Sequence, residues 1–165
     1  MCHIFGDVNI MNYIYSYMDF LNNMNDLQFE IQKLNLSCKV TSRVKQNNSV
    51  QDKFKRYMAS KHQFGEVPLK KCVNDIMGFR IVLNEFYTHD EVINFLKSNF
   101  QNIRVISADK DEYVAVHAYF ITGDNKSFQW ELQIWNKKDE KENLSSHYKY
   151  KQEYVTWENE VEKEG

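Results

Sequence analysis

The sequence predicts an α/β (α+β) fold, with a mixed central sheet of about five strands and helices packed on it. The chain has 165 residues, of which 42% are hydrophobic and 15% aromatic, enough for the core of one domain. Segments with the two-residue period or apolar run of a strand alternate with segments in which apolar residues recur every three or four positions, as in a helix. Near the C-terminal end two strand candidates follow each other directly, and Gly123-Asp124-Asn125 between them favours a hairpin.

The elements are expected in the following order. Residues 9–34 carry a helical stripe of apolar side chains that is broken near residues 22–25, and residues 38–44 alternate as in a short strand. Ser49 is expected to cap a helix that runs to about residue 60. Strands are then expected at 79–83, 103–107, 113–122 and 128–135, a helix at 90–100 after His89-Asp90, and a charged, helix-prone tail from Asp139.

Composition excludes several classes of protein. No apolar run approaches the roughly 18 residues of a membrane span, so a membrane-spanning protein is excluded. The N-terminal segment lacks a basic region before an apolar stretch, which argues against a secretory signal. Cys2, Cys38 and Cys72 are odd in number and widely spaced, so neither a disulfide framework nor a zinc site is expected, and the expected location is the cytoplasm.

Charge is unevenly distributed, although the formal net charge is only −2. Residues 39–71 contain nine Lys and Arg against two acids, whereas residues 139–165 contain eight acids against four Lys. Such a basic block is either a face that binds a polyanion or a solvated helix face, and charge alone leaves both readings open.

Two carboxylates stand out by their context. Asp75 precedes the apolar strand at 79–83, and Glu131 lies inside the strand at 128–135, where a buried carboxylate needs a metal or a cation as partner. Strand alternation places Gln133 and Trp135 on the same face as Glu131, which is either a solvated surface or the floor of a site. Two carboxylates from adjacent strands suit Mg²⁺ with substrate phosphates, while the cations around 43–53 could hold the remaining phosphate charge.

Other chemistries lack their motifs. The chain has no GxxxxGK[ST], which excludes a P-loop ATPase, and no HExxH. His89, His117 and His147 are too scattered to predict a metal set.

Several segments, taken in order, are more specific than any one of them. They are Ser42-Arg43-Val44-Lys45 with Ser49 and Lys53, Asn74-Asp75-Ile76-Met77-Gly78-Phe79-Arg80-Ile81-Val82, Tyr113-Val114-Ala115-Val116-His117, Glu131-Leu132-Gln133-Ile134-Trp135, and Ser146-His147-Tyr148-Lys149-Tyr150-Lys151. Together they resemble the synthetase domain of the RelA/SpoT family over residues 41–151. The resemblance implies a nucleotidyltransferase-like fold and a single synthetase domain over 1–165, with N-terminal helices at 1–36, a catalytic sheet region at 37–137 and a helical tail at 138–165.

The resemblance also implies an activity: Mg²⁺-dependent transfer of pyrophosphate from ATP to the 3′-hydroxyl of GDP or GTP, giving (p)ppGpp and AMP. By position, the residues that hold ATP are Arg43, Lys45, Ser49, Lys53 and Arg80. Asp75 and Glu131 hold Mg²⁺, and Glu131 also acts as the base. The acceptor is bound by Tyr113, on which its guanine stacks, and by His117, Gln133, His147 and Lys151.

Two departures from the family pattern keep other functions open. Glu112 stands where the family has glycine, and Trp135 stands where it has arginine, which removes one cation that faces phosphate. One alternative is a toxin-type pyrophosphokinase that modifies the 3′ end of tRNA or makes an adenosine alarmone. Another is a nucleotide-binding module without catalysis. Candidate partners therefore include ATP, a guanine nucleotide, tRNA, an antitoxin protein and further copies of the chain, but no membrane.

Overall fold

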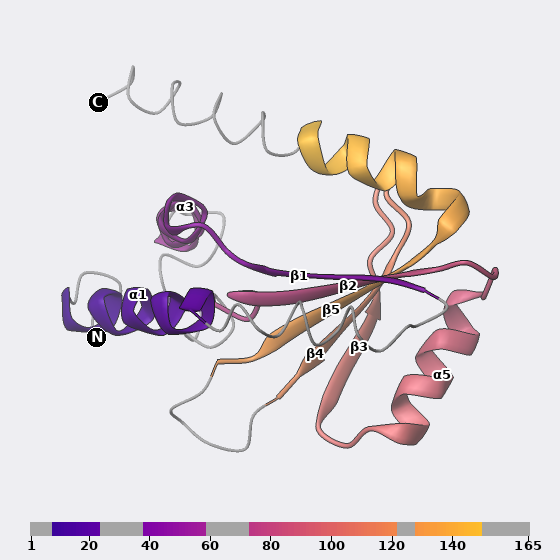
Figure 1. Ribbon diagram of the computed structural model, residues 1–165, viewed down its shortest axis with the longest axis horizontal. Helices are drawn as coiled ribbons and strands as arrows, with labels where there is room; N and C mark the ends of the chain where they lie inside the picture. The colour runs from indigo at the N-terminus through magenta and orange to yellow at the C-terminus, as the bar shows by residue number, and fades with distance from the viewer. Residues whose placement is uncertain (1–7, 24–37, 59–72, 122–127, 150–165) are drawn as a thin grey trace.

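Five strands form one mixed sheet in the computed structural model, which describes residues 8–23, 38–58, 73–121 and 128–149 (Figure 1). The strands are β1 (Lys39–Val44), β2 (Met77–Leu83), β3 (Ile103–Ser107), β4 (Val116–Phe120) and β5 (Trp130–Asn136), in the spatial order β1-β2-β5-β4-β3. β2 and β5 are parallel, and the other three neighbouring pairs are antiparallel. The predicted fold class is confirmed, with β5, the last strand among the described residues, in the centre of the sheet.

The helices lie on both sides of this sheet (Figure 1). They are α1 (Val8–Asn23), α3 (Asn47–Met58) and α5 (His89–Asn99), followed by a 3₁₀ turn, η3 (Lys137–Asp139), that continues as an α-helix over 140–149. α5 begins with a capping box, in which the Thr88 hydroxyl accepts from the Glu91 amide and the Glu91 carboxylate accepts from the Thr88 amide. Within the described part of the chain, no helix is both long enough and apolar enough to cross a membrane.

Two apolar clusters hold the helices in place. α1 and α3 bury Ile14, Met18, Val50 and Phe54 in one cluster, beside the starts of β2 and β5. On one face of the sheet, Leu96 of α5 packs with side chains of β4 and β5, namely Val116, Ala118 and Ile134. Because side chains alternate along a strand, Glu131 and Gln133 of β5 project from the opposite face.

Two expectations about local structure are wrong. α3 begins at Asn47, so Ser49 lies inside its first turn and is not the residue that caps it. The expected strand at 113–122 is shorter, because Asp111 takes a left-handed backbone conformation (φ 53°) and the chain turns tightly between Lys110 and Tyr113. Tyr113 therefore precedes β4 and does not share a strand with His117.

The remaining elements lie within two residues of their expected bounds where the structure describes them. β3 has the predicted limits. β2 starts two residues before its expected position, α5 starts one residue before, and β5 starts two residues after. The second half of the N-terminal stripe, the 123–125 turn and the tail beyond 149 lie outside the described residues.

Candidate active site

A cavity of about 410 Å³ is lined by side chains of the sheet face opposite to the one that packs against α5. α3 and the helix over 140–149 lie on this side of the sheet (Figure 1). β5 and β4 supply its floor, α3 and the end of β1 supply one wall, and the 108–113 loop supplies another. The polar face of β5 is therefore the floor of a cavity. Ten predicted site residues line it: Arg43, Lys45, Ser49, Lys53, Asp75, Tyr113, His117, Glu131, Gln133 and His147.

One wall of the cavity is cationic. It carries Arg43 of β1, Lys45 just beyond that strand, and Lys53 and Arg56 of α3. Lys53 and Arg56 are three positions apart, so they share one face of the helix. Four of the six described cations in the basic block thus converge on one concave surface, which is suited to a chain of phosphates.

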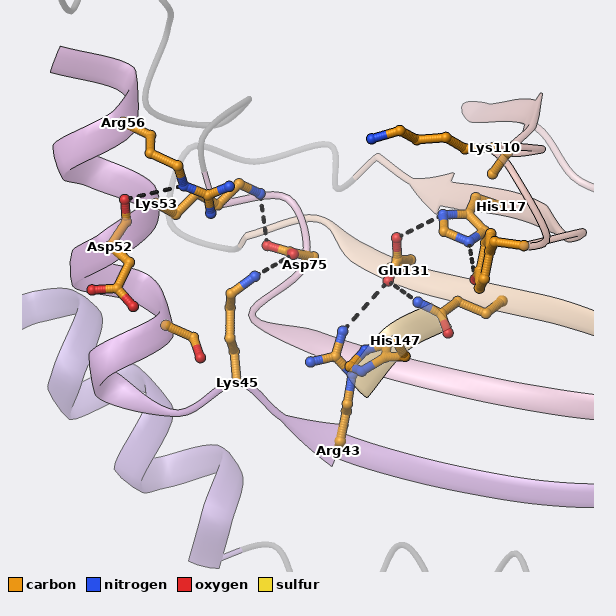
Figure 2. Close-up of a pocket in the computed structure, with 14 residues that line it drawn as sticks. Arg43, Lys45, Asp52, Lys53, Arg56, Asp75, Lys110, His117, Glu131 and His147 are labelled. Carbon is orange, nitrogen blue, oxygen red and sulfur yellow. Dashed lines mark hydrogen bonds and ion pairs between the residues drawn. The ribbon is translucent and has the colours of Figure 1, made fainter. Parts of the chain in front are cut away.

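Asp75 lies against this wall, in the turn before β2 (Figure 2). Its two oxygens accept from Lys45 Nζ at 2.5 Å and from Lys53 Nζ at 2.9 Å, while Lys53 also donates to Asn74 Oδ1 at 3.0 Å. Burial opposes ionisation of Asp75, but the two ammonium groups outweigh it and lower its pKa from the ordinary 3.8 to about 2. Burial also lowers the pKa of Lys45, and the Asp75 charge only partly offsets this effect.

Glu131 occupies the middle of the floor and is only 4% exposed (Figure 2). His117 Nδ1 lies 3.1 Å from its Oε1, Gln133 Nε2 donates to its Oε2 at 2.9 Å, and Arg43 lies 3.9 Å from Oε2. Burial raises the pKa of Glu131, but its interaction with His117 and the hydrogen bond from Gln133 act against burial, and the pKa falls below its ordinary value. An ionised carboxylate at this position can accept a proton from a substrate hydroxyl.

The two carboxylates have the donor chemistry for a divalent cation. Carboxylate oxygens completed by substrate phosphates are the usual environment of Mg²⁺, and Asp75 and Glu131 line one cavity, so the residues fit this ion. Among the described residues, no group of three or more His, Cys, Asp or Glu is arranged to hold a metal. Both oxygens of Asp75 are engaged by lysines, so an ion held there would either share this carboxylate with the ammonium groups or displace one of them.

The other end of the cavity carries aromatic and imidazole groups. The Tyr113 hydroxyl is 2.8 Å from His117 Nε2, and the two rings meet edge to face. Burial is the main cause that raises the pKa of Tyr113, to about 12, so the phenol is neutral. His147, from the helix over 140–149, completes this end, whereas Lys151 lies outside the described residues.

The loop that carries Tyr113 is anchored by a buried asparagine of the helix over 140–149. Asn143, fully buried in the helix over 140–149, donates to the Val114 carbonyl and accepts from the Val114 amide, both at 2.8 Å. Ala115 N donates to Asp109 Oδ1 at 3.2 Å from within the same loop. These bonds fix the height of Tyr113 above the sheet.

Arg80 and Trp135 do not line the main cavity. Arg80 lines a neighbouring cavity of about 170 Å³, and its guanidinium lies 3.7 Å above the Trp135 ring. Trp135 is 1% exposed and packs with Val82 and Ala115 beneath the 108–115 loop. The indole therefore adds no surface to the cavity, and a contact between Arg80 and ATP stays a prediction.

Sequence reasoning missed several residues of the site. Asp52 and Arg56 line the cavity from α3, and their helical spacing from Ser49 and Lys53 was the available signal. Lys110 lies in a loop, where no periodicity points to it. Asn143, which acts through backbone bonds, carries no motif.

Fold and site together define an α/β domain with a cationic, carboxylate-bearing cavity on one face of its sheet. The family model described as "Region found in RelA / SpoT proteins" matches residues 42–154, and the chain belongs to this family. No curated protein matches the chain in sequence.

Solved structures of small alarmone synthetases are similar to this fold. Small alarmone synthetase 2 from Bacillus subtilis is 21% identical with a TM-score of 0.51, over 86% of this chain and 79% of that one. Small alarmone synthetase 1 from the same organism is 18% identical with a TM-score of 0.46, over 87% and 79% of the two chains. The same enzyme bound to its product pppGpp is 15% identical with a TM-score of 0.44, over 88% and 78%.

Proposed function

We propose that this chain is a pyrophosphokinase that transfers the β,γ-pyrophosphate of ATP to the 3′-hydroxyl of GDP or GTP, with Mg²⁺ as cofactor. Family membership gives the class of reaction. The observation that carries the proposal is a buried, ionised Glu131 that shares one cavity with four cations, Arg43, Lys45, Lys53 and Arg56. The 1–165 sequence is proposed to act as one synthetase domain.

The proposed step balances without a further reactant. The 3′-oxygen of the acceptor attacks the β-phosphorus of ATP, and the bond between that phosphorus and the oxygen bridging to the α-phosphate breaks. AMP leaves with the bridging oxygen and its electron pair. The hydroxyl proton passes to Glu131, whose partners His117 and Gln133 hold the carboxylate in place.

The cationic wall accounts for the ATP side of the reaction. Arg43 offers a planar fork to two phosphate oxygens, while Lys45 and Lys53 act as point charges. A bound Mg²⁺ supplies charge neutralisation at the phosphates, and Asp75 and Glu131 are the residues proposed to hold it. Lys45 and Lys53 pair with Asp75 and also line the cavity, so they lie where they can donate to phosphate oxygens.

The acceptor side is proposed to comprise Tyr113, His117, Gln133 and His147. A base that stacks on the Tyr113 ring gains roughly 1–3 kcal/mol, but stacking scarcely distinguishes guanine from adenine. The acceptor identity therefore needs a direct assay.

An acceptor panel tests the function. Purified protein is incubated with Mg²⁺ and ATP labelled in the β- and γ-phosphates, together with GDP, GTP, ADP or total tRNA. The expected result is AMP release and a labelled guanosine tetra- or pentaphosphate. Label on an adenosine nucleotide or on tRNA instead identifies a toxin-type acceptor, and no turnover with any acceptor contradicts the enzyme.

A variant at the proposed base sharpens this test. Glu131→Gln keeps the shape of the side chain but removes its charge, so transfer is expected to fall at least about 100-fold. Binding of a non-hydrolysable ATP analogue, measured by calorimetry, is expected to stay within a few-fold. Glu140→Gln removes a carboxylate that pairs with Lys39 and Lys137 outside the cavity, and serves as the matched control. Full activity in E131Q contradicts the assignment of the base.

A further inference from the structure

Trp135 makes three kinds of contact beneath the proposed acceptor site. Its Nε1 donates to the Tyr113 hydroxyl at 3.2 Å, and the two rings meet edge to face at 5.9 Å between centroids. The Arg80 guanidinium lies over the face of the indole, with its central carbon 3.7 Å from the ring centroid. Arg80 in turn donates from Nη2 and Nε to Gln133 Oε1, at 3.0 and 3.2 Å.

These contacts belong to a closed ring of side chains. From Gln133 the ring continues to Glu131 Oε2, and from Glu131 Oε1 to His117 Nδ1. From His117 Nε2 it returns to the Tyr113 hydroxyl. Each member thus contacts two others, and the members in order are Glu131, Gln133, Arg80, Trp135, Tyr113 and His117.

The direction of the hydrogen bonds in the ring follows from donor chemistry. An indole nitrogen can only donate, so the Tyr113 oxygen accepts from Trp135. In the neutral form of the His117 ring, the Tyr113 O–H is then left to donate to Nε2. This places the imidazole proton on Nδ1, the nitrogen that faces Glu131. Glu131 therefore accepts from both of its neighbours in the ring, from His117 Nδ1 at Oε1 and from Gln133 Nε2 at Oε2.

We propose that Trp135 is a positioning residue that couples the orientation of Tyr113, the acceptor platform, to that of Glu131, the base. The role rests on the proposed function of these two residues, since Trp135 itself is buried and does not line the cavity. Tyr113 sits on a loop and Glu131 on a strand, so a rigid link between them sets the distance from a stacked base to the group that takes the 3′-hydroxyl proton.

Trp135→Phe separates the two functions of the indole, because a phenyl ring still offers a face to Arg80 but cannot donate to Tyr113. The KM for the acceptor is expected to rise about 3- to 10-fold, the equivalent of one neutral hydrogen bond, with the KM for ATP within about two-fold of wild type. In a Tyr113→Phe background, the same substitution is expected to have no further effect. A multiplicative effect in the double variant, or an unchanged acceptor KM in W135F, overturns the proposal.

Trp130→Phe is the matched control. It makes the same substitution in the same strand, but Trp130 projects from the opposite face, where it stacks on Phe120 with 3.9 Å between centroids. Thermal unfolding of W130F and W135F shows whether both remain folded at the assay temperature. An acceptor KM that rises equally in both variants overturns the proposal, because the effect is then general loosening of the sheet.

A spectroscopic experiment tests the ring without any turnover. Nitrogen-15 NMR of the His117 imidazole, recorded over a pH series and interpreted for the neutral form of the ring, reports which nitrogen carries the proton. Wild type is expected to show the Nδ1–H tautomer, and W135F a mixture of tautomers, since the Tyr113 hydroxyl is then free to turn. An Nε2–H tautomer in wild type, or an unchanged tautomer in W135F, overturns the proposal. If no acceptor is modified in the panel, the proposed function fails while this measurement still decides the link.

Discussion

Replacing Asp75 by asparagine is expected to remove a pH-dependent part of the stability of this fold. The carboxylate is 16% exposed and pairs with Lys45 and Lys53. Its pKa is about 2 in the folded chain against an ordinary value of 3.8. At about 1.4 kcal/mol for each pH unit, this difference amounts to about 2.5 kcal/mol of unfolding free energy at neutral pH.

The sign follows from the lowered pKa. A carboxyl group that ionises more easily in the folded state contributes its full stabilisation above the unfolded value of 3.8 and loses it as the pH falls towards 2. Between pH 5 and pH 2, the unfolding free energy of wild type is therefore expected to fall by about 2 kcal/mol more than that of Asp75→Asn. Glu140, whose pKa is also about 2, titrates in both proteins and cancels in the comparison.

Urea unfolding at several pH values between 5 and 2, followed by far-ultraviolet circular dichroism, gives both curves. At pH 7 the variant is expected to be less stable, because it leaves two buried ammonium groups without their counter-charge. Asp90→Asn, at an exposed aspartate of α5, controls for the loss of one negative charge. Parallel stability curves for wild type and D75N would refute the ion-pair reasoning.

The remaining predictions concern the walls of the cavity and the core. Arg43→Ala is expected to raise the KM for ATP about ten-fold, as expected for one charge-assisted contact, and an unchanged ATP dependence in steady-state kinetics removes Arg43 from the ATP wall. Asn143→Ala leaves the Val114 amide and carbonyl without partners, so the unfolding free energy is expected to fall by roughly 2–4 kcal/mol and the acceptor KM to rise, because Tyr113 is on the same loop. Leu96→Ala changes the core on the other face of the sheet, and chemical denaturation is expected to show an unfolding free energy lower by about 2–4 kcal/mol. Its KM values are expected to be unchanged. A raised acceptor KM in L96A would show that the effect of N143A on this KM is only a result of lost stability.

Most of the sheet could be predicted from the sequence, because its strands follow simple patterns of apolar residues. β3 and the alternation of β5 emerged from apolar periodicity alone, and so did the polar face that carries Glu131 and Gln133. The start of β4 could not be predicted in this way, because it depends on the left-handed turn at Asp111. Aspartate tolerates this backbone conformation but does not require it.

The site was predictable to the extent that its residues lie in motifs. Strand alternation put Trp135 on the face of Glu131, which the structure confirms. Alternation does not say whether a side chain on that face is exposed in the cavity or buried, as Trp135 is. Arg80 on the neighbouring strand covers the indole, and only the pairing of β2 with β5 brings the two side chains together. Asn143 and Lys110 reach the site through tertiary packing, which has no local sequence signature.

The central position of β5 also bears on how the chain is made. Until residues 130–136 have left the ribosome, β2 and β4 each present an unpaired edge, because the strand that joins them is synthesised after both. A nascent chain that ends before β5 therefore exposes two strand edges and cannot assemble Asp75 and Glu131 in one place. Translation has to pass β5 before any activity of this cavity can begin.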